Sequence, residues 1–294
     1  MKTRRKLACN LLKIVPRIGV IFTLLLGSVS VNAGDKPPLP STEQMGLFMN
    51  STTCVVLEDA SVSYNIYIKD AVEKHWKITD YEIIDREEFE ERRFMSKYSF
   101  LVLVETTFED DPEGVSYNFL NLLMGGGAQE IEEMPELVSL PLAYDDDPEI
   151  DYGYAVPAIV EYVQRHVRFV QSRRLIAKMF GKKYFNRGRD FRDKALMLME
   201  KQMTPDMNTL FKVKDVYPNY VKFVTLEELE ETLEKDEENV LYLHHVGPEG
   251  NDGAGRCFEM IFDPQGELYY YNYREVTNEN KDGFSKKDLR KIRY

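Results

Sequence analysis

The residue types that most often bind metal ions or act as nucleophiles are scarce in this sequence. The 294 residues include only four histidines and three cysteines. His244 and His245 are neighbours on a predicted strand, so their side chains point to opposite faces and cannot hold one ion together. His166 lies on the apolar stripe of a predicted helix, which favours a hydrogen-bonded core residue. We therefore predict no metal site and no cofactor.

Catalytic motifs are missing as well. No serine lies in a Gly-x-Ser-x-Gly turn, so the chain lacks the nucleophile elbow of α/β-hydrolases. The three glycines 125–127 could suggest a phosphate-binding loop, but no Lys-Ser/Thr pair follows them, and Glu130, Glu132 and Glu133 would repel phosphate. We predict a hairpin turn at these glycines instead.

No apolar run is long enough for a typical transmembrane helix. The run at 18–31 has about 14 residues, whereas about 20 are needed to span a bilayer. It follows 17 residues that include six basic residues and no acidic one, and it ends at Val31-Asn32-Ala33. These features predict a signal peptide at residues 1–33, cleaved after Ala33. We expect an exported chain, soluble in the periplasm or outside the cell; an uncleaved anchor is the alternative.

The main feature of the sequence is an internal repeat. Residues 81–105 and 221–245 align without a gap, and four glutamates and two leucines coincide. In each copy a capping residue, Asp85 or Thr225, stands three positions before a glutamate, which predicts the start of a short acidic helix. The apolar runs that follow, Phe100 to Val104 and Val240 to Leu243, are typical of buried strands. Each copy should fold as strand, helix and strand.

We therefore predict an α/β (α+β) protein with two pseudo-repeated halves, each a small mixed sheet with helices, separated by a basic helical hairpin. Residues 34–52 would form a Pro-rich extended tether. The first half would span 53–144, the acidic loop and basic hairpin 145–208, and the second half 209–294.

Individual elements follow from the same patterns. The first half should contain a strand at 53–57, a helix at 62–76 and strands at 115–124 and 137–144. The second half should open with a strand at 209–213 and contain a hairpin of strands 256–262 and 267–273. A short helix at 284–292, capped at Ser285, should close the chain.

Charge is distributed unevenly along the chain. The net charge is −20 over residues 34–164, +9 over 165–201 and −7 from 202 to the end. In the basic stretch, Pro157 suits the first turn of a helix, and a second helix is predicted through Phe191, Ala195, Leu198 and Gln202. Cations on the outer face of this hairpin would bind an anionic partner: Arg165, Arg168, Arg173, Arg174 and Lys178. The alternative is that they neutralise the acidic halves around them.

An acidic loop precedes the basic stretch. Its carboxylates are Asp145, Asp146, Asp147, Glu149 and Asp151. Ile150 and Val156 occupy positions where a calcium-binding hand needs glycine and glutamate, so that motif is excluded. A solvated linker and an irregular calcium site both stay open.

Two of the cysteines, Cys54 and Cys257, lie on predicted strands of different halves. In an oxidising compartment they could form a disulfide between the halves, and free buried thiols are the alternative. Cys257 could form a nucleophilic dyad with His244 only if the fold brings the two together.

Three segments resemble uncharacterised exported proteins of Bacteroidetes-type bacteria: FDPQGELYYYNYREV at 262–276, GFSKKDLRKI at 283–292 and TLFKVKDVYPNYVKFVTLEELE at 209–230. The resemblance covers roughly the last 85 residues. It implies export and no particular activity.

From these features we predict an exported, non-catalytic binding or accessory protein of the cell envelope, with the basic hairpin as its contact surface. Its partner would be an anionic envelope component or an acidic protein, not nucleic acid, and any membrane contact would be peripheral. The alternative is an envelope hydrolase that uses a pair of carboxylates in a cleft between the halves.

Overall fold

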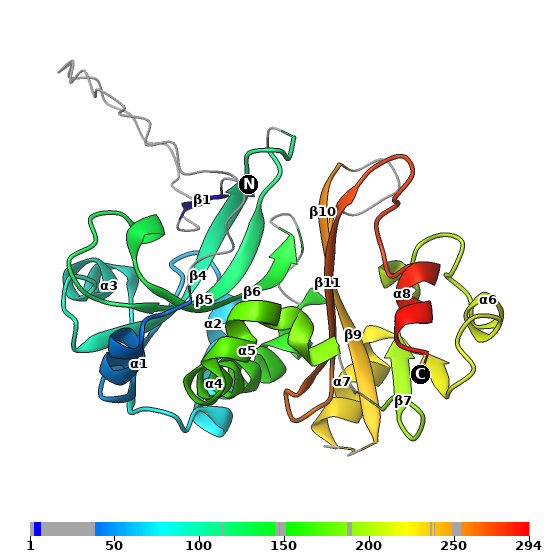
Figure 1. The fold of residues 1–294 in the computed structure, drawn as a ribbon, viewed down its shortest axis with the longest axis horizontal. Helices are drawn as coiled ribbons and strands as arrows, with labels where there is room; N and C mark the ends of the chain where they lie inside the picture. Colours follow the sequence, from blue (N-terminus) through cyan, green and yellow to red (C-terminus); the bar gives the residue numbers. More distant parts are fainter. Residues whose placement is uncertain are drawn as a thin grey trace.

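The computed structural model describes residues 3–6, 39–112, 114–144, 147, 151–186, 190–235, 237, 239–248 and 254–293. Two sheets with helices lie side by side in the molecule (Figure 1). Within these residues, no helix combines the length and the apolar character needed to cross a membrane. Apart from strand β1 (Thr3–Lys6), the predicted signal peptide and its cleavage site lie outside the described residues.

The first sheet has the strand order β3-β2-β4-β5-β6, with β1 paired to the far end of β4. Strand β2 pairs in parallel with β3 and β4, and the strands from β4 to β6 are antiparallel. The strands are β2 (Thr52–Val56), β3 (Tyr81–Ile84), β4 (Tyr98–Phe108), β5 (Tyr117–Met124) and β6 (Glu136–Tyr144). The helices of this half are α1 (Thr42–Met49), α2 (Val62–His75) and α3 (Arg86–Arg92).

The second sheet repeats this topology in the order β8-β7-β9-β10-β11. Strand β7 pairs in parallel with β8 and β9, and the strands from β9 to β11 are antiparallel. The strands are β7 (Ala195–Leu198), β8 (Val221–Phe223), β9 (Val240–Val246), β10 (Gly255–Phe262) and β11 (Leu268–Val276). The helices are α6 (Leu210–Lys214), α7 (Leu226–Glu234) and α8 (Lys286–Lys291). The prediction of two similar α+β halves is confirmed.

The repeat places the same elements in both halves. The Oδ1 atom of Asp85 accepts the backbone N–H of Glu88 at 2.8 Å, which begins α3. Thr225 accepts the N–H of Glu228 at 3.2 Å, and the Glu228 carboxylate accepts the N–H of Thr225 at 3.0 Å, which begins α7. These caps satisfy backbone donors that the first helical turn leaves free. The predicted order of strand, acidic helix and buried strand is therefore confirmed in both copies.

Three predicted elements are wrong. The second helix of the basic hairpin is strand β7, whose buried residues lie between two neighbouring strands. A strand buried on both faces has a continuous apolar run, and over so few residues this run also fits a helical spacing. The strand predicted at 209–213 is helix α6, capped by Thr209. Part of the predicted tether is helix α1, which buries Met45 and Phe48.

The basic stretch therefore does not form a helical hairpin. It consists of α4 (Val156–Ser172), α5 (Arg174–Phe180), 3₁₀ turns over Gly181–Asn186 and strand β7. Helix α4 buries Ile159, Tyr162 and Val163 in a hydrophobic core that contains residues of both halves. It lies at the junction of the two sheets (Figure 1).

An aromatic cluster joins the halves on the other side of the junction. Phe258 of β10 lies with its ring centroid 6.2 Å from that of Phe108, 5.5 Å from Tyr117 and 5.6 Å from Phe119. Burying a large apolar side chain contributes about 1.5–3 kcal/mol. The two halves are therefore held by a common core.

Candidate functional site

The basic residues singled out from the sequence lie on the outside of α4 and α5. Arg165, Arg168, Arg173 and Lys178 are exposed, and Arg174 is half-buried. Arg165 donates to the carbonyl of Gln265 at 3.1 Å, Arg173 donates to the hydroxyl of Tyr184 at 3.1 Å, and Arg174 donates to the carbonyl of Pro40. We call these five cations the basic face.

No carboxylate of the described chain lies within ion-pair distance of the basic face. Burial raises the pKa of Asp263, and the charge of Arg165 partly offsets this effect, so Arg165 contributes to neutralising the acidic second half. Lys201, at the end of the same stretch, does form an ion pair, with Asp151 at 2.6 Å.

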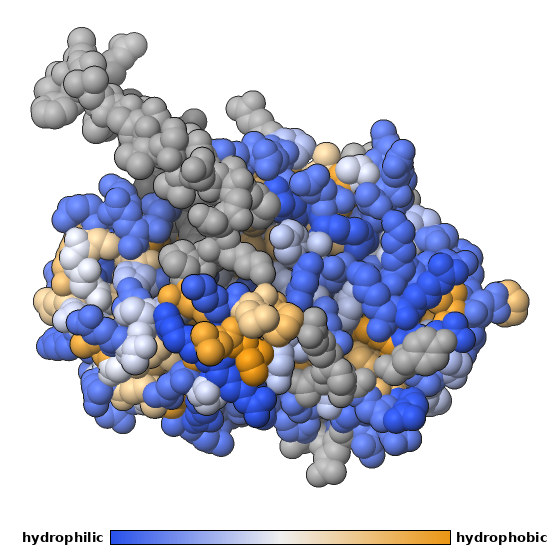
Figure 2. Space-filling view, in the orientation of Figure 1, coloured by the Kyte–Doolittle hydropathy of each residue, from blue (hydrophilic) through white to orange (hydrophobic). Residues whose placement is uncertain are grey.

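Two large apolar side chains stand between these cations. Leu175 is 78% exposed and Met179 is 68% exposed. They are four residues apart on α5, so they share one side of the helix. Figure 2 shows a hydrophobic area over α5 within a surface that is otherwise largely hydrophilic. We call Leu175 and Met179 the apolar pair.

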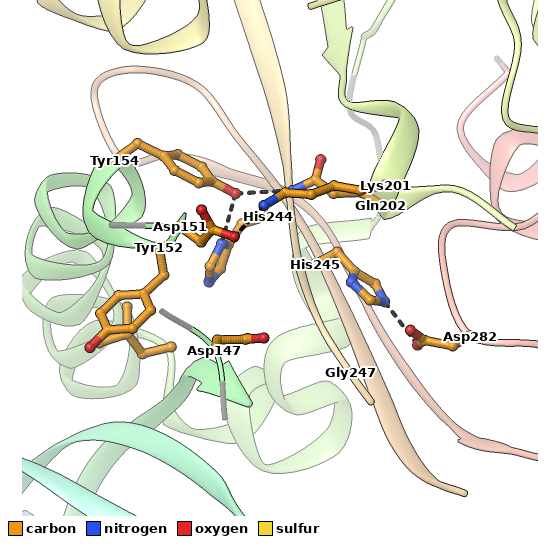
Figure 3. Close-up of a pocket in the computed structure, with 11 residues that line it drawn as sticks. Asp147, Asp151, Tyr152, Tyr154, Lys201, Gln202, His244, His245, Gly247 and Asp282 are labelled. Atoms are coloured by element: carbon orange, nitrogen blue, oxygen red, sulfur yellow. Dashed lines mark hydrogen bonds and ion pairs between the residues drawn. The ribbon is translucent and has the colours of Figure 1, made fainter. Parts of the chain in front are cut away.

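A cavity of about 300 Å³ opens where the two halves meet (Figure 3). Strand β7 pairs with β9 only as far as Tyr242, so the last residues of β9 lie beyond the end of β7. Ligands of α/β sheets often bind at the carboxyl ends of parallel strands, where such a gap forms. The cavity is lined by Leu142, Asp147, Asp151, Tyr152, Tyr154, Lys201, Gln202, His244, His245, Gly247 and Asp282.

A buried hydrogen-bond chain forms the inner wall of this cavity. The Nε2 atom of Gln202 donates to the Tyr154 hydroxyl at 3.0 Å, and the hydroxyl lies 3.2 Å from Nδ1 of His244 (Figure 3). The Tyr154 hydroxyl thus links the Gln202 amide to the His244 ring. Burial lowers the pKa of His244 to about 3, so this imidazole is neutral.

The carboxylates of the cavity all have partners. Asp151 pairs with Lys201, Asp147 accepts the N–H of Tyr144 at 2.8 Å, and Asp282 pairs with His245. A hydrolase of the predicted kind needs two carboxyl groups that face each other across the substrate. The three carboxylates are instead held by three different groups. Asp145, Asp146 and Glu149 of the acidic loop lie outside the described residues.

His245 is on the opposite face of β9 from His244, as predicted. Its Nε2 atom lies 3.0 Å from the Asp282 carboxylate, and both side chains are about one-tenth exposed. Burial alone lowers the pKa of His245, but the neighbouring Asp282 carboxylate outweighs this effect and raises it. Cys257 joins this pair: the ligand atoms of His245, Cys257 and Asp282 all lie within 4.8 Å of one another.

Cys54 and Cys257 do not pair with each other in the structure. Cys54 and Cys257 are both buried free thiols, Cys54 beside Arg92 and Cys257 beside Glu259. Burial raises the pKa of Cys54 to about 11 and raises that of Cys257 well above its usual value. The fold brings Cys257 near His245 and not His244, so the dyad considered from the sequence is not formed.

Comparison with protein-family models, with curated proteins and with solved structures finds no match. The resemblance to exported Bacteroidetes-type proteins stays a prediction. The basic face, the apolar pair and the cavity are therefore the features that bear on function.

Proposed function

We propose that this protein is an exported, non-catalytic envelope protein that docks on an anionic membrane surface through the basic face and the apolar pair. The observation that carries the proposal is that Arg173, Arg174 and Lys178, which have no described carboxylate at ion-pair distance, flank the exposed side chains of Leu175 and Met179 along α5. Cations suit lipid phosphates, and apolar side chains can enter the boundary between headgroups and acyl chains. An acidic protein that buried the apolar pair would also fit this surface, and binding to vesicles rather than to an acidic polypeptide separates the two.

The expected binding strength is that of a peripheral protein. Each cation near an anionic membrane surface contributes about 1 kcal/mol. Each side chain of the apolar pair adds about 1.5–3 kcal/mol if it is fully buried. The rest of the chain is acidic, with a net charge of −20 over residues 34–164, and would be repelled by the same membrane. Docking would therefore orient the molecule with α5 toward the lipid.

The hydrolase alternative has weaker support. The cavity between the halves exists, but its carboxylates are engaged. Glu58 and Glu259, whose pKa values burial raises, lie outside the cavity and are held by Arg86 and Arg274. We therefore favour the binding function.

Co-sedimentation of the purified protein with vesicles tests this proposal. We expect binding to vesicles that contain phosphatidylglycerol, little binding to pure phosphatidylcholine, and weaker binding as salt rises. The test variant changes Arg165, Arg168, Arg173 and Lys178 to glutamine. The control changes four exposed lysines elsewhere, Lys69, Lys222, Lys286 and Lys287, to glutamine, which removes the same charge.

A loss of binding in the test variant alone would support docking through the basic face. Equal losses in both variants would show that only net charge matters and would contradict the proposal. Binding of the parent to an acidic polypeptide but not to anionic vesicles would point to a protein partner instead. Leu175→Ser with Met179→Ser tests the apolar pair, and we expect it to weaken vesicle binding without changing the salt dependence.

A further inference from the structure

His245, Cys257 and Asp282 come together on the face of the second sheet that lies away from the junction. They come from β9, β10 and the loop before α8. His245 is opposite Glu259 across the β9–β10 ladder, so Cys257 on the same face of β10 is its diagonal neighbour. The three side chains thus offer a nitrogen, a sulfur and an oxygen within 4.8 Å of one another.

Gly247 leaves room for the Asp282 carboxylate beside His245 and Cys257. It follows β9 at the position next to the pair Val246 and Phe258, which places it across from Cys257. A Cβ atom at this position would collide with the Asp282 carboxylate and would come within 3.1 Å of the His245 ring. The missing side chain lets Asp282 reach the two residues on the strands.

The loop that carries Asp282 is fixed on both sides. Arg274 of β11 donates to the carbonyl of Lys281 at 3.1 Å and to the carbonyl of Gly283. The Arg274 guanidinium also binds the buried carboxylate of Glu259. Glu259 in turn lies 3.3 Å from the sulfur of Cys257 and accepts from Asn272 at 3.0 Å. Such an outer layer of hydrogen bonds orients metal ligands in known sites.

We propose that His245, Cys257 and Asp282 bind a divalent transition-metal ion of the zinc class, with a fourth coordination position open to the cavity. Zinc accepts this mixture of nitrogen, sulfur and carboxylate ligands, and a site with three protein ligands keeps one position for a water molecule. His245 and Asp282 line the cavity, which supplies a path for the ion and for that fourth ligand. The bound thiolate and the carboxylate together balance the two positive charges of the ion.

Only a small movement is needed to form the site. With Zn–N and Zn–S distances of about 2.0 and 2.3 Å, tetrahedral ligands lie about 3.5 Å apart. The ligand atoms now lie up to 4.8 Å apart, so the longest of these distances would have to shorten by roughly an ångström. Rotation of the Asp282 side chain on its loop can supply this movement. The hydrogen bond between His245 and Asp282 would be replaced by two bonds to the ion.

The first test is metal binding by the full-length protein after treatment with a chelator. Calorimetric titration with Zn²⁺ should give one ion per chain. Co²⁺ in place of zinc should produce a thiolate-to-cobalt charge-transfer band and the strong visible absorption of a tetrahedral site. A cobalt spectrum without the thiolate band would overturn the proposal, and so would failure to bind either ion.

Variants locate the ion. We expect Cys257→Ser to abolish the thiolate band and to weaken zinc binding at least about 100-fold, since changes to outer-layer partners alone weaken it about 10–100-fold. The matched control, Cys54→Ser, removes a buried thiol of the other half and should bind as the parent does. Unchanged zinc affinity in Cys257→Ser would contradict the site.

A second variant keeps the test decisive if Cys257→Ser does not fold. The double change Cys9→Ser with Cys54→Ser leaves Cys257 as the only thiol, so the thiolate band must persist in it. Loss of the band in that variant would assign the sulfur ligand elsewhere. The basic-face variant should bind zinc normally, so the metal site and membrane docking can fail independently.

Discussion

The two halves have the same strand order, yet they use equivalent faces of their sheets differently. Leu101 and Leu103 of β4 match Leu241 and Leu243 of β9 in the repeat. The first pair lies in the core shared by both halves, whereas the second pair lies in a separate core beneath α6 and α8. The halves therefore meet through non-equivalent faces of their sheets. The face that packs in the shared core in one half packs against its own helices in the other.

The position of the proposed metal site follows from this difference. Glu105 and Asn118 form the register pair in the first sheet that corresponds to His245 and Glu259 in the second. In the first half this face is occupied by the junction with α2 and α4. In the second half the same face is covered by α8 and the loop before it, and it collects buried polar groups.

The carboxyl ends of the parallel strands differ as well. After β2, the Glu58 carboxylate is bound by Arg86. The side-chain amide of Asn65 accepts the backbone N–H of Glu58 and donates to its carbonyl. These contacts close the carboxyl ends of the parallel strands in the first half. After β7, the chain passes through Lys201 and Gln202 and leaves the cavity open. The strand ends are therefore closed in the first half and open in the second half.

The largest loss of stability should come from replacing the arginine that binds a buried glutamate in each half, Arg86 in the first half and Arg274 in the second. We expect Arg274→Met to cost about 5 kcal/mol and Arg86→Met about 3 kcal/mol, because each leaves buried carboxylate charge without its partner. Arg274 serves both Glu259 and Asp288, whereas Arg86 serves Glu58 alone. Denaturant unfolding measures both values. Equal costs would contradict the claim that the second half carries the more demanding polar cluster.

The junction itself is tested by Phe258→Ala. This side chain is 4% exposed and contacts three aromatic rings of the first half, so its removal should cost about 3–4 kcal/mol. Tyr220→Ala, at a residue that is 62% exposed, is the control and should change stability by less than about 0.5 kcal/mol. If Phe258→Ala proved equally mild, the halves would not depend on this contact.

A pH effect should arise from α4, which joins the halves. Burial lowers the pKa of His166 to about 3, and its ring lies 3.0 Å from the Tyr162 hydroxyl. The unfolded chain takes up a proton near the usual pKa of about 6.5, so stability falls as pH drops from there toward 3, by about 2 kcal/mol at pH 5. His166→Gln should remove this part of the slope in unfolding measured from pH 7 to 5. An unchanged slope would mean that folding does not lower the pKa of His166.

The smallest expected loss of stability comes from removing the N-terminal caps of the two acidic helices, α3 and α7. Thr225→Ala and Asp85→Ala should each cost about 1 kcal/mol, because each removes a cap of the first helical turn. Thr225 takes part in a reciprocal capping box, whereas Asp85 accepts a single bond from Glu88. We therefore expect the threonine variant to lose more stability in thermal unfolding. The reverse order would show that the copies are capped differently from what their contacts indicate.

The sequence predicted what is local and missed what depends on long-range pairing. The caps at Asp85 and Thr225 and the runs at β4 and β9 are local signals, and each led to the right element. Strand β7 was missed because its four residues, three of them buried, fit a helical period as well as a strand. The equivalence of β7 to β2 appears only once the parallel pairing with β9 is known.

The same difference between local and long-range signals separates the two candidate sites. The basic face was predicted because it is a run of cations along one segment, although the second helix assigned to it is absent. The metal cluster was not predicted, because neighbouring positions in the sequence pair His245 with His244 and give no sign that Cys257 lies beside it. A signal was present: the hairpin of β9 and β10 crosses a glycine-rich loop, and its register alone brings His245 beside Cys257. Asp282 arrives from a loop that no local pattern could place.

The most direct test of the account is the affinity for anionic vesicles of the basic-face variant relative to that of the lysine control. Four cations at about 1 kcal/mol each predict a loss of at least about 100-fold for the basic-face variant. The control, which loses the same charge from residues outside α4 and α5, should change by less than about 3-fold, since exposed charges beyond a Debye length of about 8 Å are screened. Equal affinities of the two variants would contradict docking through α4 and α5.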